Sequence, residues 1–276
     1  VSMTNLVTNA GVVGSDVTGV GTARHGLGAC EYGGDKGIFA YGNDQTYLSR
    51  VSMSNLVSNA GVVATDVTGV GTARYALGAC EYGGDKGIFG FGQGPADQYC
   101  SMTNLVSNAG VVATDTAGVG TARAYGPGAC EYGGDKGIFG FGYDGSSYTA
   151  VTNLVSNAGV VATDTAGVGT ARGFGPACGY GDDKGIFGFG WSGAAYVSMT
   201  NLVSNAGVVA TDTTGVGTAR GEMGACEYGG DKGIFAYGNT GSNVSMSNLV
   251  SNAGVVATDV TGVGTARKLA QACSFN

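Results

Sequence analysis

Proline and charged side chains are scarce in this sequence, and each scarcity excludes a class of protein. Three prolines among 276 residues, without a Gly-X-Y period, exclude a collagen-like triple helix. No apolar run approaches the roughly 18 residues of a membrane-spanning helix. Only 12% of the residues are charged and the net charge is −7, so nucleic acids and anionic membranes are poor partners. The sequence has no initiator Met and no signal-peptide pattern, and we expect a processed chain or a fragment.

Glycine, in contrast, is abundant, and its 55 copies belong to a long internal repeat. Val, Ile, Phe and Tyr recur at fixed positions, which excludes a disordered chain. Thr-Ala-Arg ends at six positions, with steps of 50, 49, 49, 48 and 47 residues: Arg24, Arg74, Arg123, Arg172, Arg220 and Arg267. Asn-Leu-Val occurs six times and Asp-Lys-Gly-Ile-Phe five times. The chain therefore consists of five full repeats and a partial sixth.

Four short strands are expected in each repeat, and residues 51–100 illustrate them. Val51–Val57 and Val62–Thr65 form one predicted hairpin, because Asn and Gly lie between them where positive φ is needed. Ala79–Tyr82 and Gly87–Phe91 form a second hairpin of the same kind. The apolar spacing within Met53–Ala60 also fits a short amphipathic helix. We favour a strand there, because the segment is short and its Val and Thr neighbours suit a pleated surface.

Four strands per repeat and about six repeats predict a β-propeller. Arg74, a small apolar strand, a Gly-Gly turn and the string Gly87–Gly92 resemble the kelch pattern. This resemblance implies an all-β, six-bladed, kelch-like propeller, with residues 1–276 as a single domain and an incomplete last blade. The strings TNLVSN, GVVATDT and GVGTAR also resemble repeat proteins of phage and environmental-virus appendages. That second resemblance implies a structural protein located outside the cell or on a virion surface.

Residues that recur in every repeat are expected to be structural. The repeated Asp, as in Asp66 and Asp115, is predicted to pair with the Arg eight residues later or to cap the connecting segment. The repeated cysteine is predicted to be a small buried thiol on a glycine-lined inner strand; the alternative is a ring of thiolates around a soft metal. Its copies are Cys30, Cys80, Cys130, Cys178, Cys226 and Cys273. Equivalent strands of neighbouring blades are expected to lie too far apart for disulfides.

No catalytic site is expected in this sequence. The only histidine is His25, and the other repeats place unrelated residues at its position, so no second imidazole completes a catalytic or zinc site. An active site is normally one asymmetric constellation, whereas the acidic residues recur in each repeat. We therefore predict a protein without enzymatic activity, catalytic residues, bound metal or cofactor.

Two segments of each repeat vary, and they are expected to share one face of the molecule because alternate connections of an up-and-down blade lie on opposite sides. The varying segments are Asn43–Arg50, Gln93–Tyr99, Tyr143–Ala150, Trp191–Tyr196 and Asn239–Asn243, together with His25–Leu27, Tyr75–Leu77, Ala124–Pro127, Gly173–Pro176, Gly221–Met223 and Lys268–Gln271. We call this side the variable face and the side of the two uniform turns the invariant face. The variable face is predicted to bind ligand through Tyr47, Tyr75, Tyr99, Tyr125, Tyr143, Tyr148, Phe174, Trp191 and Tyr196. Aromatics among small polar residues suit glycan or protein surfaces, although unconstrained loops also drift in sequence.

The preferred functional hypothesis is a recognition module that presents the variable face to a glycan or protein receptor. The alternatives are a glycan-binding lectin propeller and a subunit of a linear, fibre-forming repeat array. The last blade is expected to begin at Val244 and to lack its outermost strand, because a missing middle strand would leave two unpaired rows of backbone groups. Its open edge is expected beside Ala272–Phe275, where a neighbouring subunit or a chain extension could add a strand.

Overall fold

The computed structural model describes residues 2–44 and 49–275. These residues form five antiparallel three-stranded sheets and one short 3-10 turn, η1 (Pro95–Asp97). The inner strands are β1 (Gly28–Tyr32), β4 (Gly78–Tyr82), β7 (Gly128–Tyr132), β10 (Ala177–Tyr180) and β13 (Gly224–Tyr228). The middle strands are β2 (Lys36–Ala40), β5 (Lys86–Gly90), β8 (Lys136–Gly140), β11 (Lys184–Trp191) and β14 (Lys232–Ala236). The third strands are β3 (Ser54–Val57), β6 (Thr103–Val106), β9 (Thr152–Val155), β12 (Tyr196–Val203) and β15 (Ser247–Val250).

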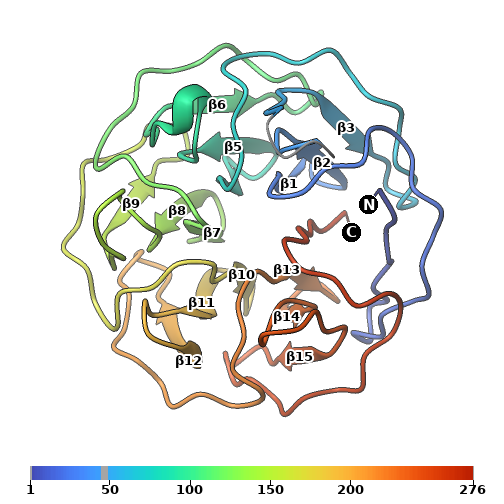
Figure 1. Cartoon of the computed structure of the whole chain (residues 1–276), viewed down its shortest axis with the longest axis vertical. Coiled ribbons are helices and arrows are strands. Elements are labelled where there is room, and N and C mark those ends of the chain that lie inside the picture. Colours follow the sequence, from blue (N-terminus) through green and yellow to red (C-terminus); the bar gives the residue numbers. More distant parts are fainter. Residues whose placement is uncertain (1, 45–48, 276) are drawn as a thin grey trace.

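The sheets are arranged around a common centre, and the chain visits them in sequence order (Figure 1). The inner strands lie closest to the centre and contact one another from sheet to sheet. The N-terminal and C-terminal segments lie side by side between β1 and β13. Across the described ranges, no helix is long and apolar enough to cross a membrane.

The predicted hairpin of Ala79–Tyr82 with Gly87–Phe91 is confirmed, because β4 and β5 pair from Gly78↔Gly90 to Tyr82↔Lys86. The equivalent strands of the first sheet, β1 and β2, pair from Gly28↔Ala40 to Tyr32↔Lys36. Gly33 and Gly34 make the connecting turn at φ of 67° and 76°, a region that side chains with a Cβ rarely adopt. The Met53–Ala60 segment contains a strand, β3, as we favoured. The predicted Val62–Thr65 strand is reduced to bridges, because β3 pairs with the following segment only through Ser54↔Val67 and Val57↔Val63.

The sheets cross the repeat boundaries, and the predicted strand grouping is therefore wrong. β3 belongs to the second repeat, yet it pairs with β2 of the first repeat from Gly37↔Val57 to Ala40↔Ser54. The same offset is found in the other described sheets. It follows that, within residues 2–44 and 49–275, no middle strand pairs with the N-terminal hairpin, which is bridged through Thr4↔Val17 and Val7↔Val13.

Contacts between the two chain ends provide the physical reason for this grouping. The Arg267 guanidinium donates to the Asn5 side-chain oxygen, and the Thr265 amide donates to Asp16 at 2.9 Å. The same pair of contacts joins every adjacent pair of repeats, for example Arg220 with Asn248 at 2.5 Å. We expected a last blade that begins at Val244 because that grouping leaves fewer backbone groups unpaired. The charge-assisted bonds between the two chain ends instead favour the grouping in which the third strand of each sheet comes from the next repeat.

The repeated Asp and Arg form ion pairs, but not with the partner that we predicted. Asp66 lies 3.6 Å from the Arg24 guanidinium of the preceding repeat, whereas we expected Arg74. Arg74 is fully buried and its own acidic neighbour is Asp115, at 3.8 Å. Each Asp also caps the connecting segment as predicted, since Asp66 accepts from the Thr22 amide at 3.0 Å. The segment between Asp and Arg carries the chain outward to the next sheet, so the nearest guanidinium comes from the neighbouring repeat.

The hydrophobic core lies between adjacent sheets, and the same packing recurs from one pair of sheets to the next. Each of the first four middle strands is associated with two aromatic residues, and the ring of the second one packs edge-on against the Phe in the middle strand of the next sheet. The four pairs have ring centroids 5.1–5.4 Å apart: Tyr41–Phe89, Phe91–Phe139, Phe141–Phe187 and Phe189–Phe235. A buried guanidinium covers the ring, as in Arg123 over Phe91 at 4.0 Å. The cysteines also bridge sheets: a Cβ on Gly137 would lie 2.6 Å from Cys80 Sγ. Among the described residues, five of the six repeated thiols pack in this way against a glycine of a neighbouring middle strand, where an added Cβ would not fit.

Candidate functional site

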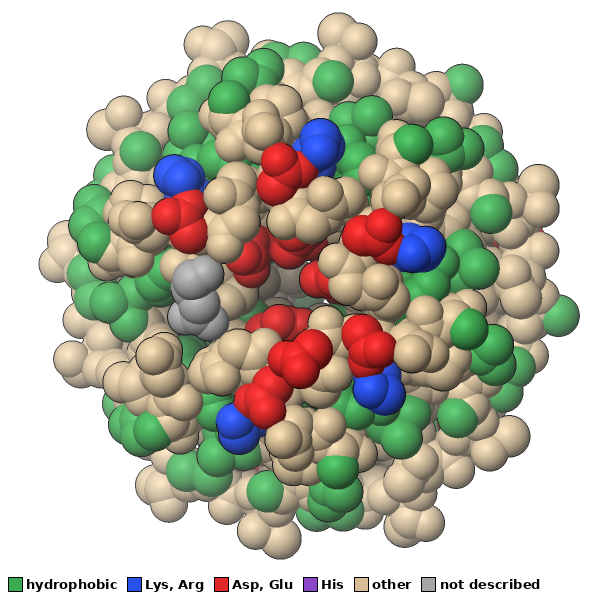
Figure 2. Space-filling view, turned by 180° about the vertical axis from the view of Figure 1, so that it is seen from behind, with side chains coloured by type: hydrophobic (Ala, Val, Ile, Leu, Met, Phe, Trp, Pro, Cys, Tyr) green, Lys and Arg blue, Asp and Glu red, His purple; other side chains and the backbone are tan. Residues whose placement is uncertain are grey.

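The structure confirms that the two variable segments of each repeat share one face. They pair directly with each other through bridges such as Tyr75↔Gln93 and Ala124↔Tyr143. The uniform turns meet on the opposite side, where Asn59 donates to Asp35 at 3.0 Å. Figure 2 shows this invariant face, with the Asp and Lys side chains of its turns forming red and blue pairs around the centre.

The variable face brings six of the nine predicted aromatic residues into one continuous group. Tyr125 lies at its centre and contacts four rings at centroid distances of 5.3–6.2 Å, those of Tyr75, Tyr99, Tyr143 and Phe174. Tyr148 extends the group from Tyr143 at 5.1 Å. We call these six residues the aromatic arc. All six are partly exposed, so their rings line a surface rather than fill a core.

Trp191 and Tyr196 form a second aromatic contact on the same face. They are cross-strand neighbours at the ends of β11 and β12, with centroids 4.9 Å apart and rings nearly perpendicular. Gly221 joins this pair to the arc, since a Cβ there would lie 3.2 Å from the Tyr196 ring and 3.4 Å from Phe174. Tyr47, the remaining predicted aromatic, lies outside the described residues.

Polar groups within the arc hold its rings in place. The hydroxyls of Tyr75 and Tyr125 are 3.2 Å apart, and the Tyr125 hydroxyl donates to Gln93 Oε1 at 3.3 Å. Arg50 lies over the Tyr75 ring at 5.2 Å and pairs with Asp97. Burial raises the pKa of the Tyr75 hydroxyl well above its ordinary value, and burial with neighbouring tyrosines raises that of Tyr99 to about 12. The hydroxyls of Tyr75 and Tyr99 are therefore neutral and able both to donate and to accept hydrogen bonds.

Two arc residues adopt a backbone conformation that favours glycine. Tyr125 and Phe174 have φ of 57° and 58°, and the equivalent positions in the other repeats are also left-handed. Backbone bonds hold them there: the Phe174 amide donates to Tyr125 at 2.7 Å, and the Glu222 amide donates to Phe174 at 2.8 Å. Such strain persists where the surrounding structure imposes it and is concentrated at functional sites. Sequence reasoning identified Tyr125 and Phe174 as candidate binding residues but did not predict their left-handed backbone; an aromatic where another repeat has Gly26 was the available signal.

The centre of the ring is acidic. Glu31, Glu81, Glu131 and Glu227 extend from inner strands and line a central pocket of 130 Å³. Burial, and then repulsion among the carboxylates, raises the pKa of Glu31 to about 7 and that of Glu81 to about 8. Burial likewise raises the pKa of the Glu131 carboxyl to about 7, as burial and repulsion raise that of Glu227 to about 8.

The repeated cysteines do not supply thiolates to this centre. Burial raises the pKa of Cys226 to about 12, and it raises the pKa of the other five thiols as well. Each thiol is therefore protonated near neutral pH, whereas metal binding and nucleophilic attack require the thiolate. Among the described residues, no group of three or more His, Cys, Asp or Glu side chains is placed to hold a metal ion.

Comparison with protein-family models finds no match to this chain, and comparison with curated proteins finds none either.

Proposed function

We propose that the chain is a kelch-like six-bladed β-propeller that acts as a non-enzymatic recognition module and binds its receptor on the variable face. The aromatic arc is the observation that supports this proposal. Its rings come from variable segments of three consecutive repeats, yet they converge on one partly exposed surface. Rings with neutral hydroxyls at their edges offer both the flat apolar surface and the hydrogen bonds that recognition of a glycan or protein requires.

The invariant face supports a division of roles, in which one face is the scaffold and the other binds the receptor. Glycine turns and Asp–Asn contacts are repeated there with little change, as expected for a scaffold. The circular arrangement of repeats supports a discrete module more than a linear array. The proposed place of such a module is outside the cell or on a virion surface, where large, repeated β-structures present binding loops.

A glycan array followed by a screen against protein receptors tests this function. Trp191→Ala and Tyr99→Ala should each weaken binding at least tenfold, because buried aromatic anchors dominate recognition, and should lower Tm by only about 2 °C. Lys86→Ala on the invariant face is the matched control and should bind as the parent chain does. Equal affinity of all three variants for the selected ligand would exclude the variable face as the binding surface.

A further inference from the structure

Each repeat exposes an apolar side chain at the outer margin of the ring. The exposed fraction of this valine is 65% in five repeats and 60% in the first: Val62, Val111, Val160, Val208, Val255 and Val12. Hydrophobic side chains also lie along the outer margin in Figure 2. The residue after the valine points the other way, and its copies Val209 and Val256 are buried. Packing within the ring therefore does not require the exposed residue to be apolar.

This valine is retained in copies whose other exposed segments have changed. All six copies have Val at this position, whereas the variable segments of the same copies differ in sequence and length. An exposed position that only solvent contacts is expected to vary as those segments do. The uniform valine therefore indicates a surface that contacts a partner outside the ring.

The main chain beside this valine has an unpaired edge. Residues 62–66 bond to the chain of β3 on their inner side, where the Ala64 amide donates to Leu56 at 2.8 Å. Val63 and Thr65 therefore direct their amides and carbonyls outward. Within residues 2–44 and 49–275, no hydrogen bond reaches these outward groups or their equivalents in the other repeats. We call residues 62–66 and their equivalents the outer segments.

The outer segments also lack the residues that commonly prevent pairing at an exposed sheet edge, which are Lys and Pro. Residues 59–71 and the equivalent ranges of the other five repeats contain no Lys, Arg or Pro. Their only charged residue is the repeated Asp, and the Asp66 carboxylate already accepts from Asn55 at 2.9 Å and from the Thr22 hydroxyl at 2.8 Å. The neighbouring Val and Thr side chains favour extended pairing.

An outer segment is complementary to a second copy of itself. In an antiparallel pair, Val63 of each copy lies opposite Thr65 of the other, so that every outward amide meets a carbonyl. Val62 then packs diagonally against Ala64 of the second copy. The two Asp66 carboxylates lie at opposite ends of the pair, about 13 Å apart, where salt screens their repulsion.

We propose that the outer segments join copies of this chain edge to edge, by antiparallel pairing of a segment of one ring with a segment of a second ring. One outer segment is too small for a stable dimer, because stable interfaces take about 20–30 residues from each partner. Each ring has six of these segments, so one copy can bind several neighbours, and assemblies larger than a dimer are expected. The proposal does not depend on the variable face or on its receptor.

The test compares the full parent chain with two variants that carry six added lysines each. In the edge variant, Lys replaces the exposed valine at Val12, Val62, Val111, Val160, Val208 and Val255. In the control variant, Lys replaces the exposed alanine of the preceding turn at Ala10, Ala60, Ala109, Ala158, Ala206 and Ala253. Both variants change the formal net charge from −7 to −1, so they differ only in where the charge lies.

Analytical ultracentrifugation and electron microscopy over a concentration series measure the assembly. The parent and the control variant should form assemblies larger than a dimer at similar concentrations, whereas the edge variant should require at least about tenfold more protein. Circular dichroism checks that both variants are folded. A parent chain that stays monomeric at about 1 mM would overturn the proposal. Undiminished assembly of the edge variant, or loss of assembly in both variants, would also overturn it.

Hydrogen exchange of the parent chain gives a second measurement that needs no variant. The amides of Val63, Thr65 and their equivalents should become protected as the concentration enters the range of assembly. The Gly84 amide is the internal control, because an added Cβ there would meet open space, and its exchange rate should not change. Assemblies in which the Val63 and Thr65 amides stay unprotected would contradict the proposal, since the copies would then meet through another surface.

Discussion

The four glutamates of the central pocket predict that this protein becomes less stable as the pH rises from about 5 to about 8. The pKa values of Glu31 and Glu131 are about 7, and those of Glu81 and Glu227 are about 8, against an ordinary value of 4.5. In this window the folded chain binds more protons than the unfolded chain, so the free energy of unfolding falls as the pH increases. Burial lowers the pKa of His25, which acts in the opposite direction, but it is one imidazole against four carboxyls.

The size of the effect follows from these pKa values. A pKa raised from 4.5 to about 7 corresponds to about 3 kcal/mol per carboxyl. Solvent screening reduces this penalty, so we expect about 1 kcal/mol per glutamate and about 4 kcal/mol for the four. At about 2 °C per kcal/mol, Tm should fall by about 8 °C between pH 5 and pH 8.

Differential scanning calorimetry across the pH range measures this slope. Glu81→Gln removes the carboxyl that the other three repel, so it should raise Tm at about pH 8 and flatten the curve. Asp85→Asn is the control: Lys86 and Asn108 hold the pKa of this exposed carboxyl below 3.8, outside the window, so the slope should not change. A Tm that is constant or rises with pH would refute the view that these carboxylates are buried together.

Three further predictions concern the packing between sheets. Phe139→Ala should destabilise the chain by about 4 kcal/mol in urea denaturation, whereas Phe39→Ala should cost at most about half as much, because its ring is already partly exposed; equal losses would contradict this difference in burial. Gly137→Ala should cost about 2 kcal/mol, since the added Cβ would lie 2.6 Å from Cys80 Sγ, and Cys80→Ala in the same chain should recover part of the loss in a double-mutant cycle. Arg123→Lys keeps the charge but loses the planar stacking and the fork of donors, and thermal unfolding should show a clear drop in Tm.

The local structure and the division into two faces could be predicted from the sequence. The strand positions could be predicted because short apolar segments lie between glycine turns. A turn position such as Gly33 requires positive φ whatever surrounds it. The repeat length located the inner-strand thiols, and the segments that vary identified the face on which Tyr75, Tyr125 and Phe174 now meet. These features depend on residues close together in the chain, and a repeat of about 48 residues displays them six times over.

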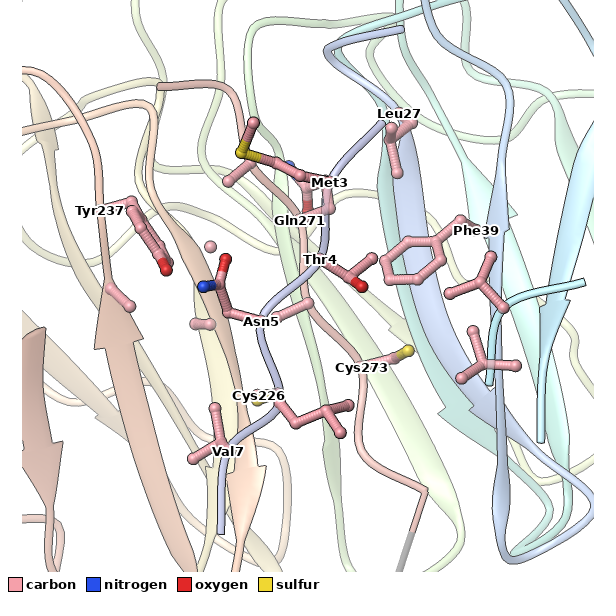
Figure 3. Close-up of a pocket in the computed structure, with 18 of the residues that line it drawn as sticks. Met3, Thr4, Asn5, Val7, Leu27, Phe39, Cys226, Tyr237, Gln271 and Cys273 are labelled. Carbon is pink, nitrogen blue, oxygen red and sulfur yellow. The ribbon is translucent and has the colours of Figure 1, made fainter. Parts of the chain in front are cut away.

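Which copies of the repeat become neighbours could not be predicted from the sequence. Near-identical repeats offer near-identical partners, so the sequence could not choose between Arg24 and Arg74 for Asp66, nor assign β3 to the sheet of β2. Closure of the chain made those choices, because bonds between the ends complete the same network that joins every other pair of repeats. Closure also gathered four glutamates around one centre and placed Tyr237 and Phe39 on opposite sides of a pocket (Figure 3). Pairing among equal copies is determined by the geometry of the ring, and that geometry is a property of the whole chain.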